Sequence, residues 1–164
     1  MKAEIFFLKY AFPCSFVHLS RKEISPKEYD LLYKSAKDEK LYLSIKKIEN
    51  IFWRAMKFVD SINDLKSVQK YWWFDHNKKI RMEKIKNVDK KECMIIPCEV
   101  ISVSGNEAIV KSPFLNGNEK LKLDLINVKI GDKITKHYDY ACEKISELLY
   151  LKMIESLKKL SYND

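Results

Sequence analysis

Glycine is scarce in this sequence, since its 164 residues include only Gly105, Gly117 and Gly131. Loops that wrap a phosphate group need several glycines close together, so a nucleotide-binding loop of that kind is excluded. Glycine supplies the positive φ angles of tight hairpin turns. Its absence from the first 104 residues therefore predicts a helical N-terminal part, followed by a part rich in turns.

Closely spaced cysteines and long apolar runs are also missing. Cys14, Cys93, Cys98 and Cys142 form no C-x-x-C pair, which argues against a zinc knuckle or ribbon. No apolar run approaches the roughly 20 residues that cross a bilayer, and the first residues show no signal-peptide cleavage site. We expect a cytoplasmic protein that does not bind membranes, with its cysteines reduced.

The net charge of +8 is spread unevenly along the chain. Residues 1–92 hold 21 Lys and Arg against 13 Asp and Glu, whereas residues 93–164 hold 10 of each. Much of the excess lies in HNKKIRMEKIKNVDKK, residues 76–91. A basic tract attracts phosphate groups, but a solvated lysine-rich connector has the same composition, and this second interpretation is favoured.

Helix signals dominate the N-terminal part. In SPKEYDLLYKSA, Ser25 is placed as an N-cap, Pro26 as the first helical residue and Glu28 as the third member of a capping box. Apolar residues then recur at a spacing of three and four. The predicted helices are residues 3–11, 25–36, 44–59 and 64–74. We expect them to form a small bundle with the aromatic residues in its core.

The period of the apolar residues changes to two after Lys91. The run CMIIPCEVISV alternates as a strand, and turns at Gly105, Gly117 and Gly131-Asp132 separate it from three further strands. Four short strands within about 50 residues are typical of a small antiparallel barrel or curled sheet.

The chain closes with a predicted helix, ISELLYLKMIESLKKL, for which Ser146 is a plausible cap. Cys142 is expected on the last turn before that helix. The predicted fold class is therefore α+β, with a helical domain over residues 1–88 and a β-barrel with a C-terminal helix over residues 93–164.

Two stretches of the barrel region carry a resemblance to a known family. CMIIPCEVISVSGNEAIV resembles the start of the HypC/HupF-type hydrogenase maturation chaperones, with its cysteine, apolar residues, proline and strand. LDLINVKIGDKITKHYDYACEKI is similar to the family's Gly-Asp and histidine segment, which leads into a helix. The resemblance puts Cys93 in the place of the essential cysteine and His137 in that of the histidine. Its structural motif would comprise Pro97, Gly105, Gly131 and Asp132.

A wider likeness covers more of the chain. KYAFPC, VQKYWW, ECMIIPCEV and KHYDYACEKI recur in that order in an uncharacterised family whose genes often lie beside hydrogenase genes. This likeness brings no established activity with it.

The chaperone resemblance implies a role in metallocentre assembly. In that family the cysteine helps to carry an iron centre between a scaffold protein and the precursor of the hydrogenase large subunit. A thiolate is a soft ligand that suits such iron. Cys93 lies within the chain, however, so the free α-amine of the family's terminal cysteine is absent here. We expect a non-enzymatic accessory protein with those two partners, no tightly bound cofactor and, at most, transient iron bound at Cys93.

Each site residue also has a plainer interpretation. Cys93 can be an inert buried thiol and His137 a structural histidine bonded to a backbone carbonyl. Cys98 is expected in the core, and His76 near a helix C-terminus, whereas His18 has no evident partner. A nucleic-acid-binding small barrel is the alternative function. The sequence offers no nucleophile with a base and an orienting group, so an enzyme is not expected.

Overall fold

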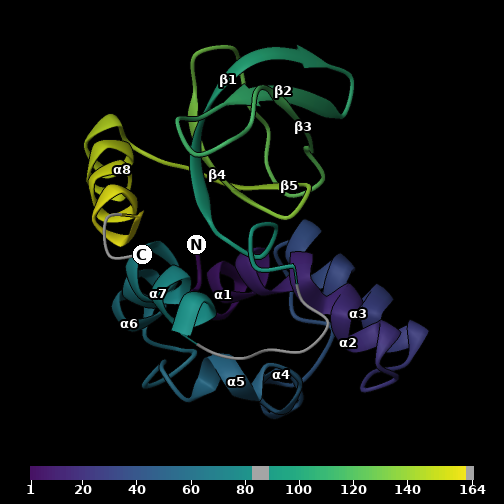
Figure 1. The fold of residues 1–164 in the computed structure, drawn as a ribbon. Coiled ribbons are helices and arrows are strands. Elements are labelled where there is room, and N and C mark those ends of the chain that lie inside the picture. Colours follow the sequence, from purple (N-terminus) through teal and green to yellow (C-terminus); the bar gives the residue numbers. More distant parts are fainter. Residues whose placement is uncertain (83–88, 162–164) are drawn as a thin grey trace. The chain divides into compact units, whose positions relative to one another are not determined.

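The computed structural model describes residues 1–82 and 89–161 and divides the chain into two compact units, Met1–Lys90 and Lys91–Asp164 (Figure 1). The first unit is helical, and the second consists of a closed β-barrel and one helix. The predicted α+β class is therefore confirmed. The central portion of the basic tract 76–91 lies outside the described residues.

Short helices, one of them a π-helix and one a 3-10 helix, make up the N-terminal unit. They are α1 (Ala3–Ala11), the 3-10 helix η1 (Phe12–Cys14), α2 (Ser15–Ser20), α3 (Pro26–Lys37), α4 (Ile45–Ile51), α5 (Trp53–Met56), α6 (Leu65–Lys70), the π-helix η2 (Tyr71–Asp75) and α7 (His76–Met82). The α1 helix contacts both α3 and α6 and is buried around nearly its whole circumference.

Aromatic side chains form much of the core of this unit, as the sequence predicted. Phe7 on α1 is fully buried and contacts the rings of Phe52 and Trp72 at centroid distances of 5.8 and 5.4 Å. Tyr10 stacks on Trp72 and accepts a hydrogen bond from Trp73 Nε1 at 3.2 Å. The core thus joins residues that lie more than 60 positions apart in the sequence.

The helix starts agree with the capping signals. The Ser25 hydroxyl accepts a hydrogen bond from the Glu28 N–H, and the Glu28 carboxylate accepts one from the Ser25 N–H, which completes the predicted capping box. Asp64 caps α6 by accepting from the Lys66 N–H at 2.9 Å. Such reciprocal bonds satisfy N–H groups that have no partner within the helix.

Two predicted helix boundaries are wrong. The helix predicted over residues 44–59 is interrupted at Phe52, whose backbone leaves the helical region (φ −98°, ψ 34°) where its ring is buried in the core. The helix predicted to end at residue 74 instead continues through η2 into α7. His76 consequently begins α7 and is buried, rather than lying at a helix C-terminus.

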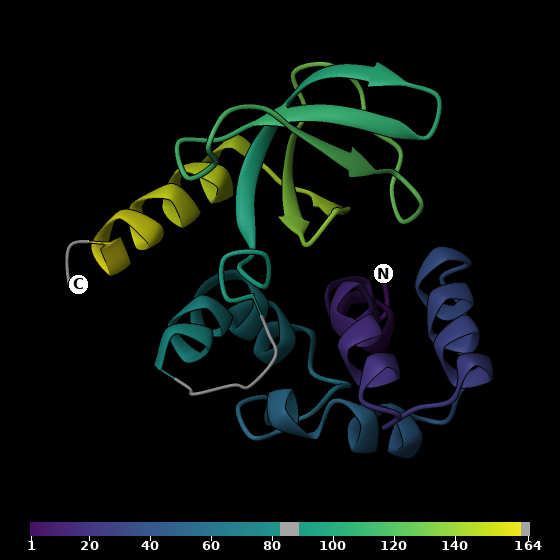
Figure 2. The same ribbon diagram turned by 45° about the vertical axis from the view of Figure 1, so that its right-hand side comes forward.

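Five strands close the barrel of the second unit. They are β1 (Ile96–Ser104), β2 (Glu107–Lys111), β3 (Glu119–Lys122), β4 (Lys133–His137) and β5 (Tyr140–Lys144), arranged in the order β1-β2-β3-β5-β4. The first part of β1 pairs with β4, and its later part pairs with β2 (Figure 2). A bulge between Val100 and Ser102 accompanies this change of partner, as expected where a strand bends to close a barrel.

The barrel differs from the predicted one in two respects. It contains a fifth strand, because Tyr140–Lys144 forms β5 where the resemblance placed a helix start, and Cys142 lies on this strand rather than on a turn. It is also mixed rather than wholly antiparallel, since β3 pairs with β5 in parallel through Lys122 and Tyr140. This parallel contact closes the sheet and leaves it without open edges.

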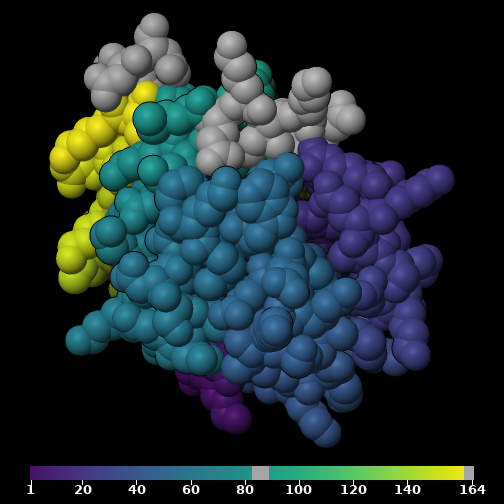
Figure 3. Space-filling view, turned by 90° about the horizontal axis from the view of Figure 1, so that it is seen from below, coloured from purple at the N-terminus to yellow at the C-terminus, as the bar shows by residue number. Residues whose placement is uncertain are grey.

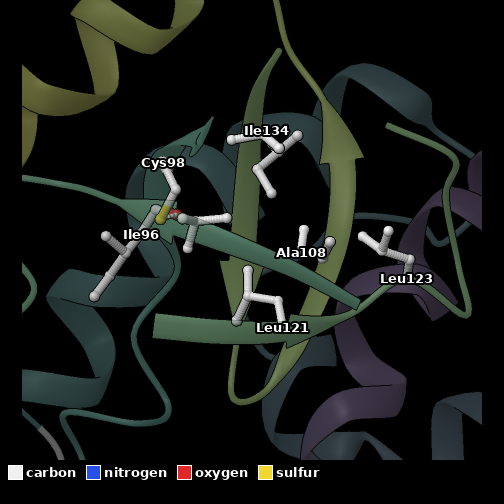
Figure 4. Close-up of a cluster of buried hydrophobic side chains, with 9 residues drawn as sticks. Ile96, Cys98, Ala108, Leu121, Leu123 and Ile134 are labelled. Carbon is white, nitrogen blue, oxygen red and sulfur yellow. Dashed lines mark hydrogen bonds between the residues drawn. The ribbon is translucent and has the colours of Figure 1, made fainter. Parts of the chain in front are cut away.

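Small and aliphatic side chains fill the barrel. Ala108, Leu121 and Ile134 converge between the strands in Figure 4, and Cys98 is fully buried in the same cluster, as predicted. The complete cluster consists of Ile96, Cys98, Val100, Ala108, Val110, Leu121, Leu123, Ile134 and Ala141.

The C-terminal helix α8 (Glu147–Ser161) contacts β1 and β4. The Ser146 hydroxyl caps it by accepting from the Leu149 N–H at 3.2 Å. Among the described residues, no helix is both long and apolar enough to cross a bilayer.

Candidate functional site

Cys93 and His137 lie together at one end of the barrel unit. Cys93 is in the turn that precedes β1, and His137 is the last residue of β4. The antiparallel register pairs Ile96 with Lys136, so the residues just before β1 lie beside the end of β4. The Cys93 Sγ and a ring nitrogen of His137 are within 4.8 Å of each other.

Backbone hydrogen bonds fix the turn that carries Cys93. The Tyr138 N–H donates to the Glu92 carbonyl at 3.1 Å, and the Met94 N–H donates to the Lys91 carbonyl at 3.3 Å. Tyr138 adopts a left-handed conformation (φ 50°), which is uncommon for a residue with a side chain. The chain therefore turns sharply just after His137, and this turn is tied to the residue just before Cys93.

Burial controls the chemistry of the thiol. Cys93 is 5% exposed, and burial raises the pKa of its thiol to about 11, with the adjacent Tyr138 side chain acting in the opposite direction. The thiol is therefore protonated at neutral pH. An unliganded Cys93 should be a poor nucleophile.

His137 is fully buried, and its ring lies against that of Tyr138, with 5.1 Å between the centroids. Tyr138 is thus in contact with both candidate ligands. A sulfur and an imidazole nitrogen form a donor pair typical of zinc, iron, copper and nickel sites. The pair fits the iron implied by the resemblance. The raised pKa of Cys93 does not prevent binding, because a metal that binds a thiol displaces its proton.

A buried ammonium group lies close to this pair in sequence and structure. The Lys136 side chain is 2% exposed and forms ion pairs with Glu119 and, at 3.9 Å, with Glu92. Buried charges persist in proteins when they are paired. Glu92 precedes Cys93, and Lys136 precedes His137. The ion pair between Glu92 and Lys136 therefore holds the segment that carries Cys93 beside the segment that carries His137.

The remaining residues of the predicted motif are structural in position. Pro97 pairs with Thr135 in the part of β1 that lies beyond its pairing with β2. Gly105 and Gly131 occupy turns with φ of +58° and +89°. The Asp132 carboxylate accepts from the Lys129 N–H at 2.9 Å and pairs with Lys144 at 2.7 Å, which lowers its pKa.

The other three cysteines are thiols in separate surroundings. Cys98 is in the barrel core, where burial raises its pKa to about 12. Cys142 is fully buried on β5, and Cys14 is half-buried at the end of η1.

The two histidines of the helical unit differ from expectation. His18 Nδ1 lies 2.6 Å from Glu23 Oε2, so it has a partner that the sequence did not reveal. Desolvation nevertheless lowers the pKa of His18. His76 packs against the rings of Tyr71 and Trp72, which places it in the aromatic core of its unit.

Sequence reasoning did not place Tyr138 and Lys136 beside the two candidate ligands. Four consecutive residues of β4, Ile134 to His137, are buried, so alternation along the strand does not mark Lys136. The left-handed turn at Tyr138 has no sequence signature. Comparisons of the chain with protein-family models, curated proteins and solved structures find no match.

Proposed function

We propose that this chain is a non-enzymatic, cytoplasmic accessory protein that docks to partners during assembly of a metallocentre, such as that of the nickel–iron hydrogenases. Its partners would be the precursor of the large subunit or the scaffold protein on which the metal centre is built. The observation that supports this proposal is the pairing of Cys93 Sγ with a His137 ring nitrogen within 4.8 Å, from residues that the sequence resemblance also pairs.

The donor set suits transient loading of a metal. Cys93 and His137 supply two ligands, and the usual four-coordinate site for zinc or a similar ion needs four. The partner that gives or takes the metal would then supply the rest. A site completed only in the complex releases its metal when the partner leaves, which is the property that a carrier needs.

Loading also requires the turn at Glu92–Met94 to move. Both ligands are buried, and the bond from the Tyr138 N–H to the Glu92 carbonyl holds the turn that carries Cys93. If a docking partner opened this bond, a metal would reach Cys93 and His137 only when the correct partner is bound. The raised pKa of Cys93 protects the thiol from alkylation and oxidation until then.

Metal binding can be tested with the whole chain, purified without oxygen and titrated with Co²⁺ as a spectroscopic substitute for Fe²⁺. We expect a thiolate-to-cobalt charge-transfer band and a binding constant that strengthens with pH, because the Cys93 proton must leave. Cys93→Ala should abolish the band, and His137→Ala should weaken binding by about 10-fold or more. Cys98→Ala is the matched control, since it removes a buried thiol from the same barrel.

Persistence of the charge-transfer band in Cys93→Ala, or its loss in Cys98→Ala alone, would exclude the proposed ligand pair. Docking is tested separately by mixing the chain with the purified large-subunit precursor or scaffold protein and measuring complex formation by size-exclusion chromatography with light scattering. Failure to bind either partner, with or without metal, would reject the role in hydrogenase assembly while leaving the metal site to be judged by the titration.

A further inference from the structure

A partly exposed tryptophan on the helical unit is surrounded by positive charge. Trp53 begins α5 and is 45% exposed. The guanidinium of Arg54 lies 4.7 Å from its ring centroid, and the ammonium of Lys57 lies 4.4 Å from it. The α4–α5 segment, blue in Figure 3, lies at the surface of the face shown there.

These two cations are not neutralised by the described part of the chain. Within residues 1–82 and 89–161, neither Arg54 nor Lys57 forms an ion pair with a carboxylate. The unit that carries them has 20 Lys and Arg against 12 Asp and Glu, so the entire excess of +8 belongs to it. A single acidic ligand would therefore meet local positive charge as well as a favourable long-range field.

A hollow of about 370 Å³ adjoins this tryptophan. Polar groups line it together with Trp53, and its acidic group is already engaged, because Glu23 pairs with His18. The walls are formed by His18, Glu23, Ile24, Lys47, Asn50, Ile51 and Trp53. A second basic–aromatic contact follows α5, where Lys79 lies 4.3 Å from the ring centroid of Phe58.

We propose that this Trp53 surface (Trp53, Arg54, Lys57 and the adjoining hollow) binds single-stranded nucleic acid. Exposed aromatic rings on which bases stack, flanked by Arg and Lys that contact phosphates, are what sequence-tolerant single-strand binding requires. Stacking of a base on an indole is stronger than a solvent-exposed cation–π contact. A base can therefore take the place of Arg54 or Lys57 on the ring, which frees that cation for a phosphate.

The barrel is a poorer candidate for this ligand. Lys120 pairs with Glu107 and Lys122 with Asp139, while Lys111 and Lys133 share Glu99. The barrel unit has equal numbers of acidic and basic residues, 11 of each. The Trp53 surface thus places nucleic-acid binding on the helical unit, apart from the metal site proposed for the barrel.

The test uses the whole chain and a fluorescein-labelled oligo(dT), with binding followed by fluorescence anisotropy over a series of salt concentrations. Trp53→Ala should weaken binding about 10-fold, in line with the loss of one stacked base. Arg54→Gln with Lys57→Gln should reduce the slope of log K against log salt by about 1.4, since each phosphate contact contributes about 0.7 for a single strand.

The control variant is Lys27→Gln with Lys34→Gln, which removes the same charge from exposed positions on α3. Within residues 1–82 and 89–161, neither lysine forms a cation–π contact. It should leave the slope nearly unchanged. Absence of salt-sensitive binding by the wild type would overturn the proposal, as would equal effects of the two double variants together with no effect of Trp53→Ala. Equally tight binding of poly-glutamate would also overturn it, because it would show an acidic-protein surface without base stacking. None of these results depends on the cobalt titration of the barrel.

Discussion

The two units of this protein differ in their balance of charge. In the barrel unit, lysines lie on carboxylates, as where Lys133 beside Glu99 holds the pKa of that carboxyl below its usual value. The helical unit also has ion pairs, such as Lys70 with Asp75, but Arg54 and Lys57 lie over the ring of Trp53 and have no carboxylate partner among the described residues. One unit is neutral in sum, and the other carries the whole excess of the chain.

This difference separates the chemistry available to each unit. A neutral barrel with a buried thiol and imidazole suits a soft cation that enters without competing with surface charge. A basic unit with an exposed indole suits an anionic ligand that carries planar aromatic rings, such as a nucleic acid. The chain therefore has two candidate sites of opposite preference, and each can be changed without touching the residues of the other.

The largest expected effect comes from core substitutions made in one unit at a time, which test whether the two units unfold independently. Phe7→Ala should lower the free energy of unfolding of the helical unit by about 3–5 kcal/mol, and Leu121→Ala should lower that of the barrel by about 2–5 kcal/mol. All three tryptophans, Trp53, Trp72 and Trp73, belong to the helical unit. Their fluorescence reports its unfolding, while pulsed alkylation of Cys98, followed by mass spectrometry, reports that of the barrel.

If the units unfold separately, Phe7→Ala shifts the fluorescence transition to lower denaturant and leaves the alkylation transition in place. A joint shift of both transitions would show that the chain unfolds as one cooperative body and that the two units are not independent in stability.

Alkaline pH should destabilise the barrel selectively. The thiol pKa values are raised to about 11 for Cys93 and about 12 for Cys98, so the unfolded chain loses these protons first as the pH rises. The stability that the protonated Cys93 thiol contributes is complete below about pH 9 and is lost as the pH rises to about 11. The raised pKa of Cys93 corresponds to about 2–3 kcal/mol of the free energy of unfolding.

The measurement is the denaturant midpoint of the barrel at about pH 8 and about pH 10.5, in the wild type and in Cys93→Ala. The variant should lose less stability between the two pH values than the wild type does. An equal loss would mean that the folded Cys93 thiol titrates as it does in the unfolded chain, contrary to its burial.

Local signals in the sequence predicted local structure well. The capping box of Ser25 and Glu28 depends on residues three positions apart, and it is present as predicted. The inward place of Cys98 follows from alternation along one strand. The pairing of Cys93 with His137, in contrast, came from a family resemblance and not from any spacing in the chain.

The parts that sequence reasoning missed depend on distant packing. The interruption at Phe52 occurs where its ring meets that of Phe7, which is 45 positions away. The strand at Tyr140–Lys144 is required by its neighbours β3 and β4, although its sequence was also compatible with a helix start. The left-handed turn at Tyr138 contains no glycine, so the sequence gives no sign of its positive φ angle.

Removal of the buried ammonium should have a moderate effect. Lys136→Met keeps an unbranched side chain that is one heavy atom shorter, but it leaves Glu119 without its cation. The Glu119 side chain is 34% exposed and can be hydrated, so we expect a loss of about 1–2 kcal/mol rather than the roughly 3–5 kcal/mol of a fully buried pair. The loosened Glu92–Met94 turn should also let iodoacetamide reach Cys93 faster.

The matched control is Lys120→Met, whose pair with Glu107 is exposed on both sides and should contribute less than about 1 kcal/mol. Alkylation of Cys93 is measured by peptide mass spectrometry under native conditions. If Lys136→Met and Lys120→Met give the same rate, the ion-pair network does not hold the turn, and the backbone bond from Tyr138 must do so alone.

The smallest expected effect concerns the capping box of the helical unit. Ser25→Ala should lower its free energy of unfolding by about 1 kcal/mol, because the Glu28 N–H loses its acceptor at the start of α3. Hydrogen bonds from Lys47 and Ser25 hold the pKa of Glu28 at about 2, so its contribution is complete above about pH 4.5 and is lost as the pH falls towards 2. Tryptophan fluorescence should show this acid sensitivity diminished in Ser25→Ala, whereas the alkylation rate of Cys93 should stay as in the wild type. A change in that rate would mean that a cap in the helical unit alters the barrel site, and the two units could then no longer be treated as chemically separate.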